Sequence, residues 1–448
     1  MPFSAAIADA PLRPFQIVVA VFGLTLLVID GVDLQSLSLV TPLILDEWSI
    51  DRALFGPALA ASLFGMGFGS ILGGLLGDRI GRLNTLFIAS LIFGSTTIAA
   101  AYTNTVWEMS VVRMIGGLGF GAAYPNALAL VSDWVSARHR PHAIALLSVG
   151  IPVGITVSAE VLPLLLPDHG WRGAFVIFGV GSLIFGVIMR LVLREPPAFL
   201  LAKGKPDAAH KSAARVLEGD FALAPEPEDE LAERPGERIG IFHARNKRLN
   251  IAMVVSFSAA TTLVYGLLNW TTELLTSAGF TLEQALRATS WQGILSVIGG
   301  VSAGLLVRTF GSRAMILGAA TGITATIMAL AWMVEGLSGP PSASQITTIV
   351  ALEGLAVGLV SMTISMFYVV MAQGYPSACR SGGIGFVITS GRVFSIAMVF
   401  AGGWLLNLGG DSFLWYFAVL LAVALLVFPA AWIIDCHIEP VRRKEQFA

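Results

Sequence analysis

A succession of long apolar runs constrains this chain more than any other feature. About twelve runs of roughly 20 residues follow one another, and a helix of that length crosses a hydrocarbon core about 30 Å thick. The composition agrees, because 55% of the residues are hydrophobic and only 12% are charged, whereas soluble domains carry about 25% charged residues. The expected spans are 16–38, 53–76, 84–101, 109–132, 142–166, 173–193, 249–275, 286–307, 314–334, 346–372, 382–405 and 413–434.

The lipid environment decides what form these spans take. Lipid offers no hydrogen-bond partner to an exposed backbone, so a spanning segment is either a helix or part of a closed barrel. Barrel strands alternate apolar and polar residues, whereas these runs are continuously apolar. The sequence therefore predicts an all-α polytopic membrane protein with twelve transmembrane helices. No cleaved signal peptide is expected, because the small residues at 6–10 precede the first apolar run instead of following it.

The basic residues predict the orientation in the membrane. With the N-terminus in the cytoplasm, 22 of the 27 Lys and Arg residues fall in cytoplasmic segments, when Arg190 at the cytoplasmic end of the sixth span is counted with them. Three fall in outer loops, at Arg52, Arg172 and Arg287, and two lie deeper within spans, at Arg113 and Arg392. This bias predicts cytoplasmic N- and C-termini. Since topology already explains the basic residues, nothing indicates nucleic acid as a partner.

The two cysteines are Cys379 and Cys436, in a short loop and the tail on the predicted cytoplasmic side. Nothing in their placement suggests a disulfide framework, and we expect reduced thiols.

One connection is much longer than the others. Residues 194–248 are polar and include the acidic run APEPEDELAERPGER, and they divide the chain into an N-terminal bundle (1–193) and a C-terminal bundle (249–434), with a tail at 435–448. We expect this segment to be a cytoplasmic linker with an amphipathic helix around 207–217 and a disordered acidic middle. A solvated tether explains it; a regulatory docking site is the alternative.

The halves of the chain resemble each other weakly. GDRIGR (77–82) has a counterpart in RTFGSR (308–313), and SARHR (136–140) has one in SACR (377–380). These offsets are compatible with duplication of a six-helix unit, and paired repeats with a central pathway are typical of secondary transporters.

Two carboxyl groups interrupt the first span. Asp30 lies about 14 residues past Gln16, roughly 21 Å along a helix, so it cannot reach the interface. An intramembrane Asp costs about 2.5–3.5 kcal/mol, so this one must face a cavity or a partner. Asp33 follows on the same helical face. Desolvation and mutual repulsion disfavour two charged carboxylates, so at least one can bind a proton near neutral pH.

We therefore predict that Asp30 and Asp33 serve proton coupling and substrate binding. Gly31 between them is expected to let a substrate approach the backbone. The alternative is that the carboxyl groups only brace the fold through a pair with Arg113, which we also count among the substrate-binding candidates.

Arg392 lies near the middle of the eleventh span. A guanidinium group there can bind a substrate carboxylate through two parallel hydrogen bonds, and pairing with Glu353 in the tenth span is the alternative. An aromatic substrate would also need apolar walls and polar partners. The candidates are Tyr124, Asn126, Tyr265, Asn269 and Trp270, for each of which simple packing is the alternative.

The loop GDRIGR lies at the cytoplasmic end of the second span. We expect Asp78 to accept hydrogen bonds from a helix N-terminus, and Arg79 and Arg82 to pair across the junction between the halves. With Gly77 and Gly81 as turn residues, the loop is predicted to gate the pathway; anchoring by positive charge alone is the alternative.

Glycine-rich runs at 67–77 and 116–123 lie inside apolar helices without a flanking strand, so they indicate close helix packing and not a nucleotide loop. The sequence has no HExxH, CxxC or P-loop lysine motif. We predict a non-enzyme without metal or organic cofactor, driven by an ion gradient.

Two of these segments resemble signatures of the major facilitator superfamily: GMGFGSILGGLLGDRIGR (65–82) and REPPAFLLAKGK (194–205). Four more resemble the aromatic acid:proton symporters within it: DGVD (30–33), RMIGGLGFGAAYPNAL (113–128), LVYGLLNWTTELLTSAG (263–279) and YPSACRSGGIGFVITSGRV (375–393). Thr271 and Thr272 depart from that pattern, because such carriers often have Leu-Pro there.

The resemblance implies two pseudo-symmetric six-helix halves, a bacterial inner membrane and a monomer. It implies proton-coupled uptake of a small organic acid, a hydroxybenzoate- or protocatechuate-like aromatic carboxylate, by alternating access. Two other functions stay open. Proton antiport of drugs is one, since SVGIPVG (148–154) partly matches the antiporter motif; a membrane sensor that binds an organic acid without moving it is the other.

Overall fold

The computed structural model describes most of the chain. The described residues are 3–7, 12–136, 138–217, 223–224, 241–337, 339–375, 379–410, 412–434 and 437–439. Four predicted features therefore lie outside the described residues: the acidic middle of the linker, residues 376–378, Cys436 and the end of the tail.

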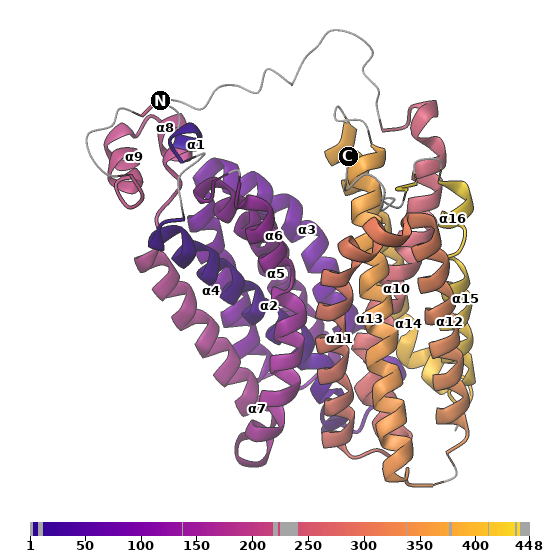
Figure 1. Cartoon of the computed structure of the whole chain (residues 1–448). Coiled ribbons are helices and arrows are strands. Elements are labelled where there is room, and N and C mark those ends of the chain that lie inside the picture. Colours follow the sequence, from indigo (N-terminus) through magenta and orange to yellow (C-terminus); the bar gives the residue numbers. More distant parts are fainter. Residues whose placement is uncertain are drawn as a thin grey trace. The chain divides into compact units, whose positions relative to one another are not determined.

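The described residues form helices joined by short connections (Figure 1). Their bounds are α1 (Phe3–Ala6), α2 (Pro14–Trp48), η1 (Arg52–Leu54), α3 (Gly56–Ile80), α4 (Arg82–Ala100), α5 (Val106–Trp134), α6 (Arg140–Ser148), α7 (Gly150–Val192), α8 (Pro197–Ala202), α9 (Pro206–Ala213), η3 (Ala244–Asn246), α10 (Lys247–Ser277), α11 (Leu282–Phe310), α12 (Ser312–Glu335), α13 (Ala343–Gly374), α14 (Arg380–Asn407), α15 (Leu414–Leu425) and α16 (Ala430–Ile433).

Eleven helical segments in the described part of the chain are long and apolar enough to cross a membrane. The twelfth expected segment is not missing, because the fifth and sixth predicted spans both lie in the continuous stretch His142–Val192. Gly170 has φ 62° within that stretch and kinks the helix sharply. A left-handed φ is accessible to glycine without steric penalty, so a single residue reverses the chain where we expected a separate loop.

Contacts group the chain into two compact units. The first contains Met1–Leu34, Ala61–Gly154 and Asp168–Arg234, and the second contains Gln35–Ala60, Ile155–Pro167 and Pro235–Ala448. In the first unit α4 lies along α5, and in the second α11 lies along α13 and α10 along α14.

Two short segments from the N-terminal half thus belong to the second unit by contact. The Gln35 amide donates a hydrogen bond to the Leu268 carbonyl at 2.8 Å, and a Cβ on Gly56 would lie 2.0 Å from the Phe400 carbonyl oxygen. The predicted boundaries at 193, 248 and 434 concern chain order and stay a prediction.

The glycine-rich runs pack α3 directly against α5. A Cβ added at Gly69 would lie 2.2 Å from the Leu118 carbonyl oxygen, and one at Gly121 would lie 2.3 Å from that of Met66. These distances are too short for any side chain, so the helices touch through their backbones. The packing predicted from the sequence is confirmed at these positions.

The linker begins with two short helices, α8 and α9. The α9 helix, from Pro206 to Ala213, overlaps the first part of the predicted 207–217 helix. Its Ala209 and Ala213 side chains are buried, and the Ser212 hydroxyl donates to the Glu195 carbonyl at 2.6 Å. The Arg215 guanidinium lies 6.0 Å from the centre of the Phe15 ring of α2, and contacts group the start of the linker with the first unit.

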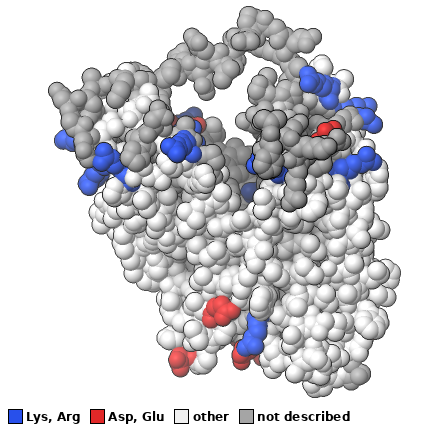
Figure 2. Space-filling model, in the orientation of Figure 1, with Lys and Arg blue, Asp and Glu red and all other residues white. Residues whose placement is uncertain are grey.

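Charged side chains are distributed unevenly along the helices. On the face shown in Figure 2, Lys and Arg gather at one end, whereas the opposite end shows mainly Asp and Glu. This asymmetry is what the loop charges led us to expect, and the direction of the chain in the membrane stays a prediction.

Replacement of Gly121 by alanine should destabilise the protein, because its methyl group would overlap the Met66 carbonyl of α3. The matched control is Gly67→Ala, where nothing lies within 4 Å of the new Cβ. We expect thermal unfolding in detergent to shift down for G121A and to stay level or rise slightly for G67A. Equal midpoints would show that the α3–α5 contact is not as tight as described.

Candidate functional site

Asp33 forms a buried ion pair with Arg113. The Arg113 Nη1 lies 3.1 Å from Asp33 Oδ2 and donates a second hydrogen bond to the Asp33 carbonyl oxygen at 3.2 Å. The Thr97 hydroxyl donates to Oδ1 of the same carboxylate, and the guanidinium lies 5.0 Å from the centre of the Phe175 ring. Four helices of the first unit thus converge on one charge pair.

This ion pair is the bracing contact that the sequence left as an alternative for the acidic pair. It accounts for Asp33 but not for Asp30. Thr97 and Phe175, which complete the surroundings of Arg113, are ordinary residues of apolar helices, and no sequence pattern marked them.

Asp30 is equally buried, with 2% of its surface exposed, yet it has no hydrogen bond or ion pair with any described residue. Its Oδ1 atom is enclosed without a donor. A charged carboxylate without a partner is costly in such a place, so the neutral acid is the stable form there. Asp30 is therefore the proton-binding candidate of this unit.

Gly31 has a different role from the one expected. A Cβ at this position would lie 2.3 Å from the Ile151 carbonyl oxygen of α7, and one at Gly154 would lie 2.2 Å from the Val28 carbonyl oxygen of α2. The backbone at Gly31 is covered by a neighbouring helix, so the expectation that a substrate approaches it is wrong.

Arg392 is half-buried on α14 and has no hydrogen bond or ion pair with a described residue. Glu353, its suggested alternative partner, lies at 0% exposure on α13 and interacts instead with Thr271 and Gln292. The alternative pairing is therefore wrong in this conformation.

Two candidates in the first unit differ in their surroundings. Tyr124 is half-buried, and its hydroxyl has no partner in the described part of the chain. Asn126 is buried and donates from Nδ2 to the Gly73 and Ala122 carbonyls at 2.8 and 2.9 Å. The Asn126 amide thus joins α5 to α3, whereas the Tyr124 hydroxyl joins no helices in the described part of the chain.

Three candidates follow one another on α10. The Trp270 indole is fully buried, donates to the Val399 carbonyl at 3.0 Å and fills the space beside Gly402 and Gly403 of α14. Asn269 donates to the Tyr265 carbonyl at 2.9 Å within its own helix. Trp270 therefore fixes α10 to α14, and the half-buried Tyr265 has the more accessible side chain.

The GDRIGR loop is built differently from our expectation. Gly81 has φ 105° and begins α4, which explains the glycine there. Arg82 pairs with Asp133 of α5 at 3.1 Å, inside the first unit. Its expected pairing across the halves stays a prediction. Asp78 and Arg79 are exposed and have no such contacts among the described residues. A gating role for the loop stays a prediction.

The carboxylate at the N-terminus of α4 comes from Glu195 and not from Asp78. Its side chain accepts from the backbone N–H groups of Leu83 and Asn84 at 3.3 and 2.9 Å. Burial raises the pKa of the Glu195 carboxyl above its ordinary value, while these N–H donors and the Arg190 charge act in the opposite direction. The sequence marked the segment around Glu195 only as a family motif, because a cap 112 residues away in sequence leaves no local signal.

A polar network at the end of the second unit was also not predicted from the sequence. Arg52 of η1 lies 3.9 Å from Glu273 on α10 and donates to the Ser277 hydroxyl and the Leu406 carbonyl at 2.9 Å each. It donates to Asn407 as well. Glu273 is only 6% exposed, so solvation by water does not explain a charged carboxylate there, whereas the Arg52 guanidinium does.

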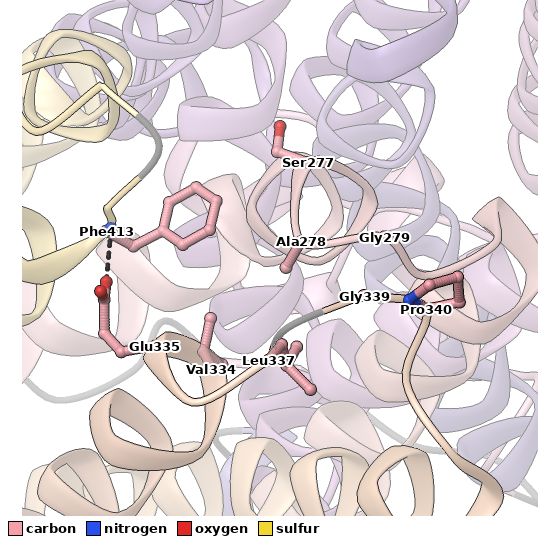
Figure 3. A pocket seen from close by; sticks show the side chains of 9 residues that line it. All are labelled: Ser277, Ala278, Gly279, Val334, Glu335, Leu337, Gly339, Pro340 and Phe413. Carbon is pink, nitrogen blue, oxygen red and sulfur yellow. Dashed lines mark hydrogen bonds between the residues drawn. The ribbon is translucent and has the colours of Figure 1, made fainter.

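Two cavities in the second unit are separate from the predicted residues. One of about 370 Å³ is lined by the ends of α10 and α12 and the turns beyond them (Figure 3). Its one acid, Glu335, accepts from the Phe413 backbone and from Ser412. The other, of about 420 Å³, lies among the mostly apolar side chains of α10, α14 and α15. Neither has a basic group among the described lining residues to bind a carboxylate.

No cluster of three His, Cys, Asp or Glu residues that could bind a metal ion occurs in the described ranges. The candidate residues include the buried acids Asp30 and Asp33 and the half-buried guanidinium of Arg392, which are groups able to bind protons and anions.

Comparison with known proteins gives matches over most of the chain. A sequence profile of the Major Facilitator Superfamily matches residues 21–378. The 4-hydroxybenzoate transporter PcaK of Acinetobacter baylyi is 29% identical over 441 residues, which cover 95% of this chain and 91% of the relative. A protein of Pseudomonas putida named as a gallate transporter is 25% identical, with 90% and 88% covered.

Among solved structures, the xylose transporter XylE from E. coli superposes with a TM-score of 0.68 at 17% identity, with 95% of this chain and 99% of XylE covered. A bacterial homologue of the human lysosomal transporter Spinster gives the same TM-score at 15% identity, with 94% and 97% covered. At these identities the likeness concerns the fold alone, and it agrees with the predicted architecture.

Asp33→Ala should destabilise the protein much more than Asp30→Ala. The first change leaves the Arg113 guanidinium buried without its counter-ion, which costs about 3–5 kcal/mol, whereas the second removes a carboxyl that has no partner. Thermal unfolding of the purified variants in detergent measures the difference. A similar loss in both variants would contradict the distinction between a paired and an unpaired acid.

Proposed function

Because this chain belongs to the major facilitator superfamily, we propose that it carries an aromatic carboxylate into the cell together with protons, by alternating access. The predicted superfamily and fold are confirmed by the profile match and the solved structures. Support for the substrate class comes from relatives named as 4-hydroxybenzoate and gallate transporters over at least nine-tenths of this chain.

The proposed proton coupling rests on the burial of Asp30 without a partner among the described residues. A carboxyl group that is buried without a partner is stable while protonated and must meet water or a cation before it loses the proton. Alternating access provides such a change of surroundings once in each cycle. Asp30 is the proton carrier, and its neighbour Asp33 keeps Arg113 neutralised until a proton weakens that pair.

Arg392 is the proposed anchor of the substrate carboxylate. Its guanidinium group has no acid to neutralise it among the described residues, and two parallel N–H donors match a carboxylate. Tyr124 and Tyr265 offer half-buried phenol groups to a ring and its hydroxyls, whereas Asn126 and Trp270 are occupied in helix packing. Protons are the only coupling ion, and no cofactor takes part.

Uptake of radiolabelled 4-hydroxybenzoate and protocatechuate into proteoliposomes tests this function. Accumulation should require an inward proton gradient. Asp30→Asn and Asp33→Asn should each abolish accumulation of the acid against its own concentration gradient, because an Asn amide does not take up a proton. The variant proteins should still insert. Binding without uptake would favour the sensor, and proton-driven export of cationic dyes would favour efflux.

Arg392→Lys should raise KM for the acid about tenfold or more, since an ammonium group cannot make both parallel hydrogen bonds and each bond to a charged group contributes about 1.5–3 kcal/mol. The matched control is Arg287→Lys, because that exposed side chain pairs only with Glu283. An unchanged KM in R392K would remove Arg392 from the substrate site.

A further inference from the structure

A second buried acid lies in the C-terminal helices, outside the proposed site. Glu353 of α13 is completely buried. Its Oε2 atom accepts from Gln292 Nε2 of α11 at 2.8 Å, and the Thr271 hydroxyl of α10 lies 3.2 Å from the same oxygen. Gln292 Nε2 also donates to that hydroxyl at 2.9 Å. We name Thr271, Gln292 and Glu353 the α10–α11–α13 cluster.

The cluster has too few donors for its acceptors. The single hydroxyl hydrogen of Thr271 has a closer acceptor in the Leu267 carbonyl oxygen, at 2.7 Å. The amide hydrogens of Gln292 serve Thr271 and Glu353. Oε1 of Glu353 and Oε1 of Gln292 are then both enclosed, and neither has a donor among the described residues. One additional hydrogen on the carboxyl group would supply the missing donor.

No cation compensates a charge on Glu353. In the described part of the chain no Lys, Arg or His pairs with it, and Arg392 makes no hydrogen bond or ion pair with it. The titratable group that interacts with its charge is the Tyr416 phenol of α15, which donates to the Gly266 carbonyl at 3.0 Å. Glu273, on the same helix as Thr271, is already paired with Arg52. An uncompensated buried carboxylate costs several kcal/mol, whereas a neutral acid does not.

We propose that Glu353 is a second proton-binding residue, neutral in this conformation, which gives up its proton when transport exposes the α10–α11–α13 cluster. The inference rests on the proposed proton-coupled function and extends it to the C-terminal helices. The sequence departs from the related carriers at Thr271, and this departure places a hydroxyl group beside Glu353 and Gln292 in the cluster.

Infrared spectroscopy of the purified protein tests whether Glu353 holds a proton. A protonated carboxyl group has a C=O absorption that a carboxylate and an amide lack. We expect Glu353→Gln to remove one such absorption from the spectrum of the wild type at neutral pH. The control is Glu283→Gln, an exposed acid on α11 that pairs with Arg287 and should remove none. An unchanged protonated-carboxyl region in E353Q would overturn the inference.

Transport separates a coupling role from a structural one. E353Q should keep the exchange of labelled for unlabelled acid across the membrane, since a neutral side chain satisfies the cluster. It should lower the number of protons moved per substrate by one, measured from the membrane potential that balances the acid gradient. Glu353→Asp keeps a titratable group and should keep the wild-type ratio.

The outcomes distinguish this inference from the proposed function. Wild-type protein that does not accumulate acid with a proton gradient overturns the proposed function. Normal wild-type coupling with an unchanged ratio in E353Q overturns only the role of Glu353. If E353Q fails to insert, E353D is measured in its place. Shortening the side chain by one methylene moves the carboxyl group, so the protonated C=O absorption should shift if Glu353 is its source. An unshifted spectrum contradicts the inference.

Discussion

A carboxyl group enclosed by membrane-spanning helices must either meet a cation or hold a proton. Coulomb attraction compensates the lost hydration only when the partner is close and well oriented. Asp33 pairs with Arg113, and Glu273 pairs with Arg52. Asp30 and Glu353 have no cation among the described residues, and for them we propose the second solution. The ion pairs hold helices together in one protonation state. The neutral form of an unpaired acid is favoured only while the acid stays buried. A conformational cycle that exposes it can therefore release its proton.

Much of the fold followed from properties that act over one helix length. Apolar runs of about 20 residues predicted the spans, and glycines within them predicted the close approach of α3 and α5. The exception at Gly170 has the same origin, since hydropathy measures length and polarity and does not detect a one-residue reversal. The depth of Asp30 and Asp33 could likewise be estimated from the rise per residue.

The partners of the candidate residues could not be predicted, because they come from segments distant in the sequence. Asp78 had the correct chemistry for a helix cap, but Glu195 occupies that position from beyond α7. Trp270 had the surface of a ligand wall, but the glycines of α14 make room for it inside the helix pair. In each case the residue type indicated which kind of interaction the side chain can make, and only the packing determined its partner.

The contact between α2 and α7 at Gly31 and Gly154 has a mechanical consequence. Two backbones in direct contact leave no space between them, so neither helix can move closer to the other at this point. The segment of α2 that contains Asp30 and Asp33 therefore has a fixed closest distance to the start of α7. A residue larger than glycine at position 31 or 154 would separate the helices and shift the segment that contains both aspartates.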